Sequence, residues 1–181
     1  MRRSVMKTQI PSSSIFLRDK ECQQMNKNEK VKLLRVREGD FTINFENRKY
    51  VARGKSKGMK VTPSVEVPWD CYEFLAFSST TFRDGELVIA KDNENYDMLM
   101  EHIVNDLEQY EINSITREDI VKILNSNVTS MQKELQRITS ANLKQWVLRI
   151  AKEIGIDNTI KQKFLIEWLD IKHRTVEDLF Y

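Results

Sequence analysis

The sequence predicts an α+β protein, in which a small antiparallel β-sheet or partly open barrel with one short helix precedes a C-terminal helical bundle. Apolar and polar residues alternate with period two in the first half, and apolar residues recur at helical spacing from residue 96 onward. A chain of 181 residues can bury a core without disulfides or metals. We therefore divide it into a flexible basic N-terminal arm (1–29), a β-rich basic domain (30–91) and a helical domain (92–181).

The β-rich domain contains several short segments with strand character. They cover residues 30–37, 41–45, 49–53 and 61–67. Gly39-Asp40 and Glu46-Asn47 stand where turns are needed between them. Pro63 lacks a backbone N–H, so the last of these segments is expected at a sheet edge.

A short helix and one further strand complete this domain. Pro68 is suited to a helix start, which predicts a helix over residues 69–77 that carries several aromatic side chains. The sequence Arg83-Asp84-Gly85-Glu86 predicts a turn, and residues 87–90 predict the strand after it.

Local capping signals divide the helical domain. Thr116 and Asp119 resemble a capping box, although Asp replaces the usual Glu or Gln. Ser140 can cap the next long helix, and Gly155 can end it in the left-handed conformation. Asp157 can then start the last long helix.

The net charge of +2 conceals an uneven distribution along the chain. Residues 1–68 contain 16 Lys and Arg against 7 Asp and Glu, whereas residues 69–119 contain 3 against 13. A basic surface attracts polyanions through counterion release. The alternative is that the basic and acidic parts pack against each other.

A glycine-containing basic segment at 47–60 is the first candidate site. Glycines let backbone N–H groups approach a phosphate, basic side chains neutralise it, and aromatic rings can stack on bases. The segment has no Walker or dinucleotide spacing, and a solvated hairpin has the same composition. The residues expected to contact nucleic acid here are Arg48, Lys49, Tyr50, Arg53, Lys55, Lys57 and Lys60.

The second candidate site is a pattern after Ile150 that looks like a helix-turn-helix, with a small residue, a glycine turn and flanking apolar residues. This resemblance implies that Asn158, Lys161 and Lys163 lie on or near the groove-facing helix. The pattern departs from the motif because Lys161 occupies a position that should turn an apolar residue inward, and Ile160 comes one place early. A purely structural helical hairpin explains the segment equally well.

An acidic stretch within residues 92–111 is the third candidate site. A negative helix face that includes Glu101, Asp106 and Glu108 could imitate a phosphate row and bind a basic protein groove. The alternative is that these residues only keep the helix soluble.

The sequence offers no adequate grounds for an enzyme. Its two histidines, His102 and His173, belong to no metal-binding spacing, and its two cysteines, Cys22 and Cys71, lie far apart. We therefore expect no catalytic residues, no metal and no cofactor. A third class, a metal-dependent enzyme that uses scattered carboxylates, would rest on Asp84, Asp92 and Asp97.

Together these features predict a non-enzymatic nucleic-acid-binding accessory or regulatory protein. Its expected partner is a nucleic acid, DNA rather than RNA, a nucleoprotein machine, or both. The composition is reminiscent of small accessory proteins of phages and mobile elements. The alternative is a protein-binding inhibitor of a nucleic-acid-processing machine, such as an anti-CRISPR protein acting on a nuclease, or a virion component. Neither a signal peptide nor a membrane span is evident, so we expect a cytoplasmic protein with no membrane partner.

Overall fold

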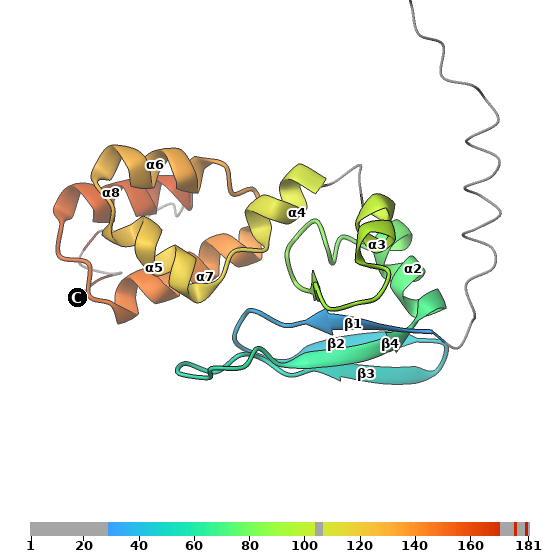
Figure 1. Ribbon diagram of the computed structural model, residues 1–181. Helices are drawn as coiled ribbons and strands as arrows, with labels where there is room; N and C mark the ends of the chain where they lie inside the picture. Colours follow the sequence, from blue (N-terminus) through green and yellow to red (C-terminus); the bar gives the residue numbers. More distant parts are fainter. Residues whose placement is uncertain (1–28, 104–106, 171–175, 177–179, 181) are drawn as a thin grey trace, which may run out of the picture.

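The computed structural model describes residues 29–103, 107–170, 176 and 180. It shows the predicted α+β arrangement, with strands and two helices in residues 29–103, here called the β-rich half, and a group of helices in residues 107–170, the helical half (Figure 1). The predicted N-terminal arm lies outside the described residues except for Glu29.

Among the described residues, five strands pair antiparallel and form two small sheets. They are β1 (Lys30–Leu34), β2 (Phe41–Phe45), β3 (Arg48–Ala52), β4 (Ser64–Pro68) and β5 (Val88–Ile89). The first sheet has the order β4-β1-β5, and β2 pairs with β3 in the second. β4 lies at a sheet edge, as Pro63 just before it predicts.

Turn chemistry fixes the β2–β3 hairpin. Glu46 and Asn47 have φ angles of 46° and 62°, the left-handed conformation that a two-residue hairpin turn requires at both positions. Phe41 therefore pairs with Ala52, and Phe45 pairs with Arg48. The strand predicted at 30–37 ends earlier, at Leu34. The backbone N–H of Arg35 still donates to the carbonyl of Pro63, but Pro63 has no N–H with which to continue the ladder.

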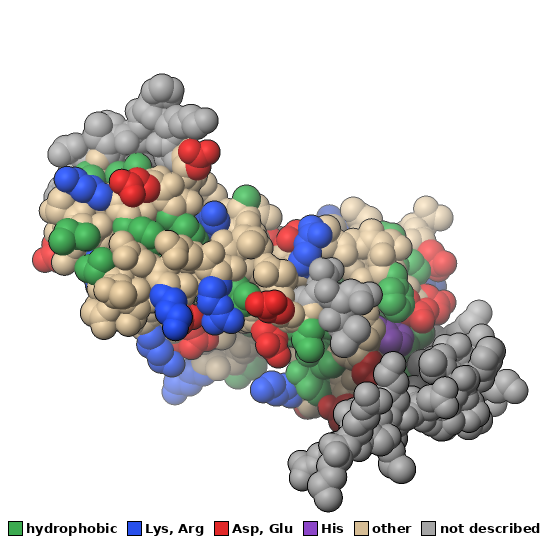
Figure 2. Space-filling model, turned by 90° about the horizontal axis from the view of Figure 1, so that it is seen from above, with side chains coloured by type: hydrophobic (Ala, Val, Ile, Leu, Met, Phe, Trp, Pro, Cys, Tyr) green, Lys and Arg blue, Asp and Glu red, His purple; other side chains and the backbone are tan. Residues whose placement is uncertain are grey.

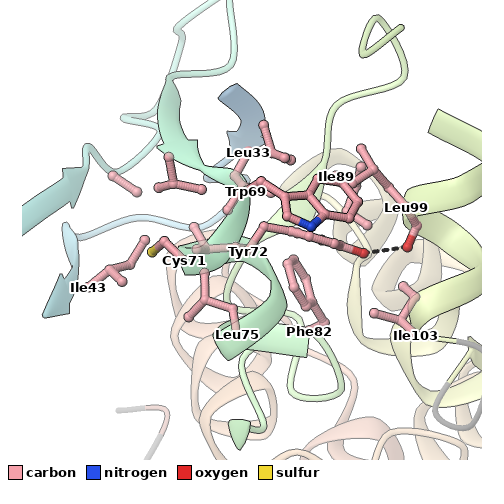
Figure 3. Packing of buried hydrophobic residues seen from close by; sticks show 14 of the residues in the cluster. Leu33, Ile43, Trp69, Cys71, Tyr72, Leu75, Phe82, Ile89, Leu99 and Ile103 are labelled. Carbon is pink, nitrogen blue, oxygen red and sulfur yellow. Dashed lines mark hydrogen bonds between the residues drawn. The ribbon is translucent and has the colours of Figure 1, made fainter. Parts of the chain in front are cut away.

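The helix α2 (Trp69–Ser78) begins directly after Pro68, as predicted, and packs its buried residues against the sheets. Figure 3 shows this first core, in which Tyr72 donates a hydrogen bond to the carbonyl of Leu99 in α3 (Tyr96–His102). The first core contains residues of the strands together with Leu99 of α3 and, further along the chain, Tyr110. α3 therefore packs with the strands.

The helical half consists of five helices among the described residues. They are α4 (Leu107–Asn113), α5 (Arg117–Asn125), α6 (Val128–Gln136), α7 (Ala141–Glu153) and α8 (Thr159–Trp168). A second core forms among the four helices α5, α6, α7 and α8, from residues that include Leu124, Leu135 and Leu165.

The predicted caps of these helices are present. Thr116 and Asp119 form the capping box of α5, Ser140 caps α7, and Gly155 has a φ of +68° after its end. α8 starts one residue later than expected from Asp157, because the side chain of Asn158 accepts hydrogen bonds from the backbone N–H groups of Ile160 and Lys161. None of the helices described here has the length and apolar character that a membrane crossing demands.

Candidate nucleic-acid interface

The β2–β3 hairpin has one face toward the core and one toward solvent. Ile43 and Ala52 are buried, and Tyr50 packs against the first core from the same side. Because neighbouring strand residues point to opposite faces, the residues between them face outward. The outward face carries Thr42, Asn44, Lys49 and Val51, with Lys49 paired to Asn44 and Val51 to Thr42. This face contains no carboxylate.

The predicted basic residues occupy different environments. Arg48, Lys49, Arg53, Lys57 and Lys60 are exposed. Arg53 forms an exposed ion pair with Asp40 at 2.7 Å, whereas Arg48, Lys49, Lys57 and Lys60 form no ion pair within the described parts of the chain. Lys55 is largely covered and lies 3.5 Å from Glu118 of α5.

Tyr50 does not share the face of its basic neighbours. Its ring is half-buried on the core side of β3, whereas Lys49 lies on the solvent side. Arg48 has the same strand parity as Tyr50 and lies near Glu46 and Asp70 at the opposite end of the strand from the loop. By strand parity Lys49 and Arg53 point outward, and Lys57 and Lys60 are exposed on the loop that follows; we call these four cations the hairpin face.

The β3–β4 loop projects from a fixed base. The backbone N–H of Gly54 donates to Asp40, and that of Lys55 donates to the carbonyl of Arg37. A Cβ atom at Gly54 would lie 2.3 Å from the backbone nitrogen of Gly39, so only glycine fits there. The loop seen beyond the left ends of β3 and β4 is thus anchored where it leaves the sheet (Figure 1).

The tip of this loop combines cations with apolar side chains. Met59 is 45% exposed and Val61 is 77% exposed. Lys60 lies between them in the sequence, and Lys57 precedes both. The sequence analysis did not single out these two apolar residues, nor Thr42 opposite Val51 and Asn44 opposite Lys49. Strict alternation along 41–45 could have identified the outward pair once the core face was assigned.

Other basic residues of the first segment are neutralised internally. Arg35 and Arg37 are buried and share the carboxylate of Glu86, at 2.7 and 2.9 Å. Lys32 pairs with Asp92 at 2.6 Å. Part of the basic surplus is thus used against the acidic segment. Within the hairpin face, Arg53 pairs with Asp40 and Lys57 lies near Glu153, whereas Lys49 and Lys60 form no ion pair among the described residues.

The α7–α8 pair places its predicted contact residues in contrasting positions. The ammonium group of Lys161 points inward and donates to the carbonyls of Leu124 and Ser126, each at 2.7 Å, at the end of α5. Asn158 is occupied as the cap of α8, whereas Lys163 is exposed. Ile160 is 62% exposed, so the outward face of α8 presents one apolar and one basic side chain in its first turns.

The acidic surface adjoins exposed aromatic side chains. Glu101 of α3 and Glu108 of α4 are exposed, and Asp106 lies outside the described residues. On α2, Phe77 is 65% exposed, and the ring of His102 lies 5.3 Å from it. Burial lowers the pKa of His102, against the opposing effect of nearby carboxylates. Figure 2 shows acidic and apolar side chains close together on the β-rich half, at the right of the view.

The described residues contain no group of three or more His, Cys, Asp and Glu side chains that could hold a metal ion. Asp84 accepts a hydrogen bond from Thr80, and Asp92 is paired with Lys32. Burial raises the pKa of the Cys71 thiol to about 11, which keeps it protonated at neutral pH.

These features define a two-part α+β protein whose β-rich half presents a basic hairpin face. Residues 29–105 match the family model described as the YonA N-terminal domain, and residues 116–175 match the one described as the YonA C-terminal domain. Together the two ranges cover more than half of the chain, so most of it is similar to these two YonA domains. No curated protein and no solved structure matches it.

Proposed function

We propose that this protein is a non-enzymatic nucleic-acid-binding accessory or regulatory protein, of a phage or mobile element, and that it contacts DNA through the hairpin face. The observation that carries the proposal is the outward side of the β2–β3 hairpin. It carries Thr42, Asn44 and Lys49 with no carboxylate among them, and the exposed cations Arg53, Lys57 and Lys60 follow along the chain, of which Arg53 pairs with Asp40.

Contacts to the phosphate groups of the DNA would supply most of the affinity for DNA. Lys49 and Arg53 alternate along one strand face, and Lys57 and Lys60 extend the positive charge along the loop. Thr42 and Asn44 can add hydrogen bonds to phosphate oxygens from the same face. The exposed ion pair between Arg53 and Asp40 costs little to break, because solvent screens such pairs.

The test compares two variants of equal charge change by mobility shift with random duplex and single-stranded DNA. The first replaces Lys49, Arg53, Lys57 and Lys60 by Gln. The matched control replaces four other exposed cations by Gln, namely Lys91, Lys122, Lys133 and Arg137. We expect the first variant to lose at least about tenfold in affinity and the control to lose much less. Equal losses would overturn the assignment to the hairpin face.

The separate variant Lys163→Gln tests the helix-turn-helix interpretation. Because Lys163 is the exposed cation among the three residues predicted there, groove binding by α8 would require it. We expect no more than a twofold change, since the hairpin face carries the contact. A loss larger than that of the hairpin variant would move the interface to α8.

A second candidate function is protein binding, as an inhibitor of a nucleic-acid-processing machine or as a virion component. The specific observation that favours it is the exposed Phe77 beside the acidic surface that includes Glu101. Aromatic side chains are enriched at protein interfaces, and acidic groups steer association with a basic partner. Absence of any DNA shift at low salt, with partner binding lost in Phe77→Ala and Glu101→Lys, would favour this function.

A further inference from the structure

A cavity of about 560 Å³ lies where the chain after β1 meets α7. We call it the junction cavity. The charged residues of its wall are Arg35, Arg37, Glu38, Glu86, Arg149 and Lys152. The volume falls within the range of small-molecule sites in proteins.

Each carboxylate at this cavity is shared by two guanidinium groups. Glu86 accepts from Arg35 at 2.7 Å and from Arg37 at 2.9 Å. Glu38 accepts from Arg117 at 2.8 Å and pairs with Arg149 at 2.9 Å. Lys152 adds an exposed cation to the wall. The wall therefore has more positive than negative charge, with four cationic side chains and two carboxylates.

The wall also has more hydrogen-bond donors than acceptors. Arg37 and Trp146 are both at least nine-tenths buried. Even so, the Nε atom of Arg37 and the Nε1 atom of Trp146 have no hydrogen-bond partner within the described residues. Such orphaned donors are uncommon and call for an explanation. Burial lowers the pKa of Arg37, and repulsion from Arg35 adds to this effect while Glu86 opposes it. A further anion nearby would relieve that repulsion.

We propose that the junction cavity binds a phosphate group, carried either by a small phosphorylated molecule or by the end of a nucleic-acid strand. Arginine forks match phosphate oxygens in geometry, and a doubly charged anion would balance the surplus on the wall. Arg149, which is 52% exposed, and Lys152 would receive the phosphate from the open side, and Asn142 and Gln145 of α7 would donate from the same helix.

The inference goes beyond the proposed function, because the hairpin face and the junction cavity are separate sets of residues. Arg35 and Arg37 are buried structural residues, so their replacement would also unfold the protein. Arg149 and Lys152 are exposed residues of the wall, and changes there test binding without removing the core of the network.

The experiment titrates the intact protein with pyrophosphate and, in parallel, with sodium chloride at the same ionic strength, and follows thermal stability and calorimetric heat. We expect pyrophosphate to raise the melting temperature several degrees more than sodium chloride does. The double variant Arg149→Gln with Lys152→Gln should weaken binding by about tenfold or more. The control pair Lys122→Gln with Lys133→Gln should bind as the unmodified protein does.

Further arms of the same experiment distinguish the two sources of phosphate. Binding of a nucleoside 5′-monophosphate as well as pyrophosphate indicates a small molecule. A preference for a 5′-phosphorylated oligonucleotide over its 5′-hydroxyl counterpart indicates a strand end. The hairpin variant, with Lys49, Arg53, Lys57 and Lys60 replaced, should keep pyrophosphate binding even where duplex affinity is lost. No response to any phosphate, or an equal response in the Arg149 and Lys152 double variant, would overturn the proposal.

Discussion

Gly85 lies where the β-rich half touches the end of α4. Its φ angle is +66°, and a Cβ atom there would lie 2.0 Å from the carbonyl oxygen of Asn113 and 2.9 Å from a guanidinium nitrogen of Arg37. Gly58 also has a positive φ, of +85°, but its Cβ position is open. A substitution at Gly58 therefore causes backbone strain alone, whereas one at Gly85 causes both strain and a steric collision.

We expect Gly85→Ala to lower the free energy of unfolding by about 3 kcal/mol or more, because a collision adds to the strain. Gly58→Ala should cost about 1–2 kcal/mol from strain alone. Urea denaturation of both variants measures the difference. Equal losses would show that the contact between Gly85 and Asn113 does not constrain the fold.

Cys71 provides a chemical test of the first core. Its side chain is fully buried, and its pKa is raised to about 11. A thiol with a raised folded pKa stabilises the fold below its unfolded pKa of about 8.5, and this contribution is lost as the pH rises toward 11. In a Cys22→Ser background, we expect a thiol reagent at pH 8 to modify Cys71 only after unfolding. Rapid modification of the native protein would contradict the packing of α2.

In α8, Lys161 was predicted to contact DNA, but its ammonium group binds the end of another helix. Lys161 donates to two carbonyls at the end of α5, where a helix leaves unpaired acceptors. We expect Lys161→Met to lower the free energy of unfolding by about 1–2 kcal/mol, because those carbonyls lose a charged donor. Duplex affinity should be unchanged at a temperature where the variant is folded. A selective loss of affinity with unchanged stability would assign Lys161 to nucleic acid instead.

The elements that the sequence predicted well depend on local chemistry. Pro68, the Thr116 and Asp119 capping box, and Ser140 act within one turn of their helices, so the sequence alone locates these helix starts. The early end of β1 depends instead on its partner strand, because the residue facing Arg35 is Pro63, which is distant in sequence and has no N–H to donate. The orientation of Tyr50 and Lys161 likewise depends on packing partners that periodicity does not reveal.

At the scale of the whole molecule, charged contacts join the two halves. Asn142 of α7 donates to Glu86 at 3.0 Å, and Glu38 binds both Arg117 and Arg149. The charge segregation seen in the sequence thus corresponds partly to an internal network. The sequence could not show which cations this network uses, because that depends on the approach of the two halves.

Removal of one network carboxylate should be costly. Glu86→Gln leaves Arg35 and Arg37 buried with their counter-charge removed, and we expect it to lower the free energy of unfolding by about 3–5 kcal/mol. The control Glu66→Gln breaks only an exposed pair with Lys30 and should change stability by less than about 1 kcal/mol. Chemical denaturation measures both variants. A small effect of Glu86→Gln would mean that the network does not stabilise the junction between the halves.

The most direct test of the central claim, that the hairpin face remains available to a polyanion, is the salt dependence of duplex binding. Fluorescence anisotropy with a labelled random duplex would be measured from about 50 to 200 mM salt. If the four cations of the hairpin face each contact a phosphate, log K should fall against log salt with a slope of about −3 to −4, which is about a hundredfold loss over this range. The hairpin variant should show a slope near zero. No measurable binding at the lowest salt concentration, or an unchanged slope in that variant, would contradict the account.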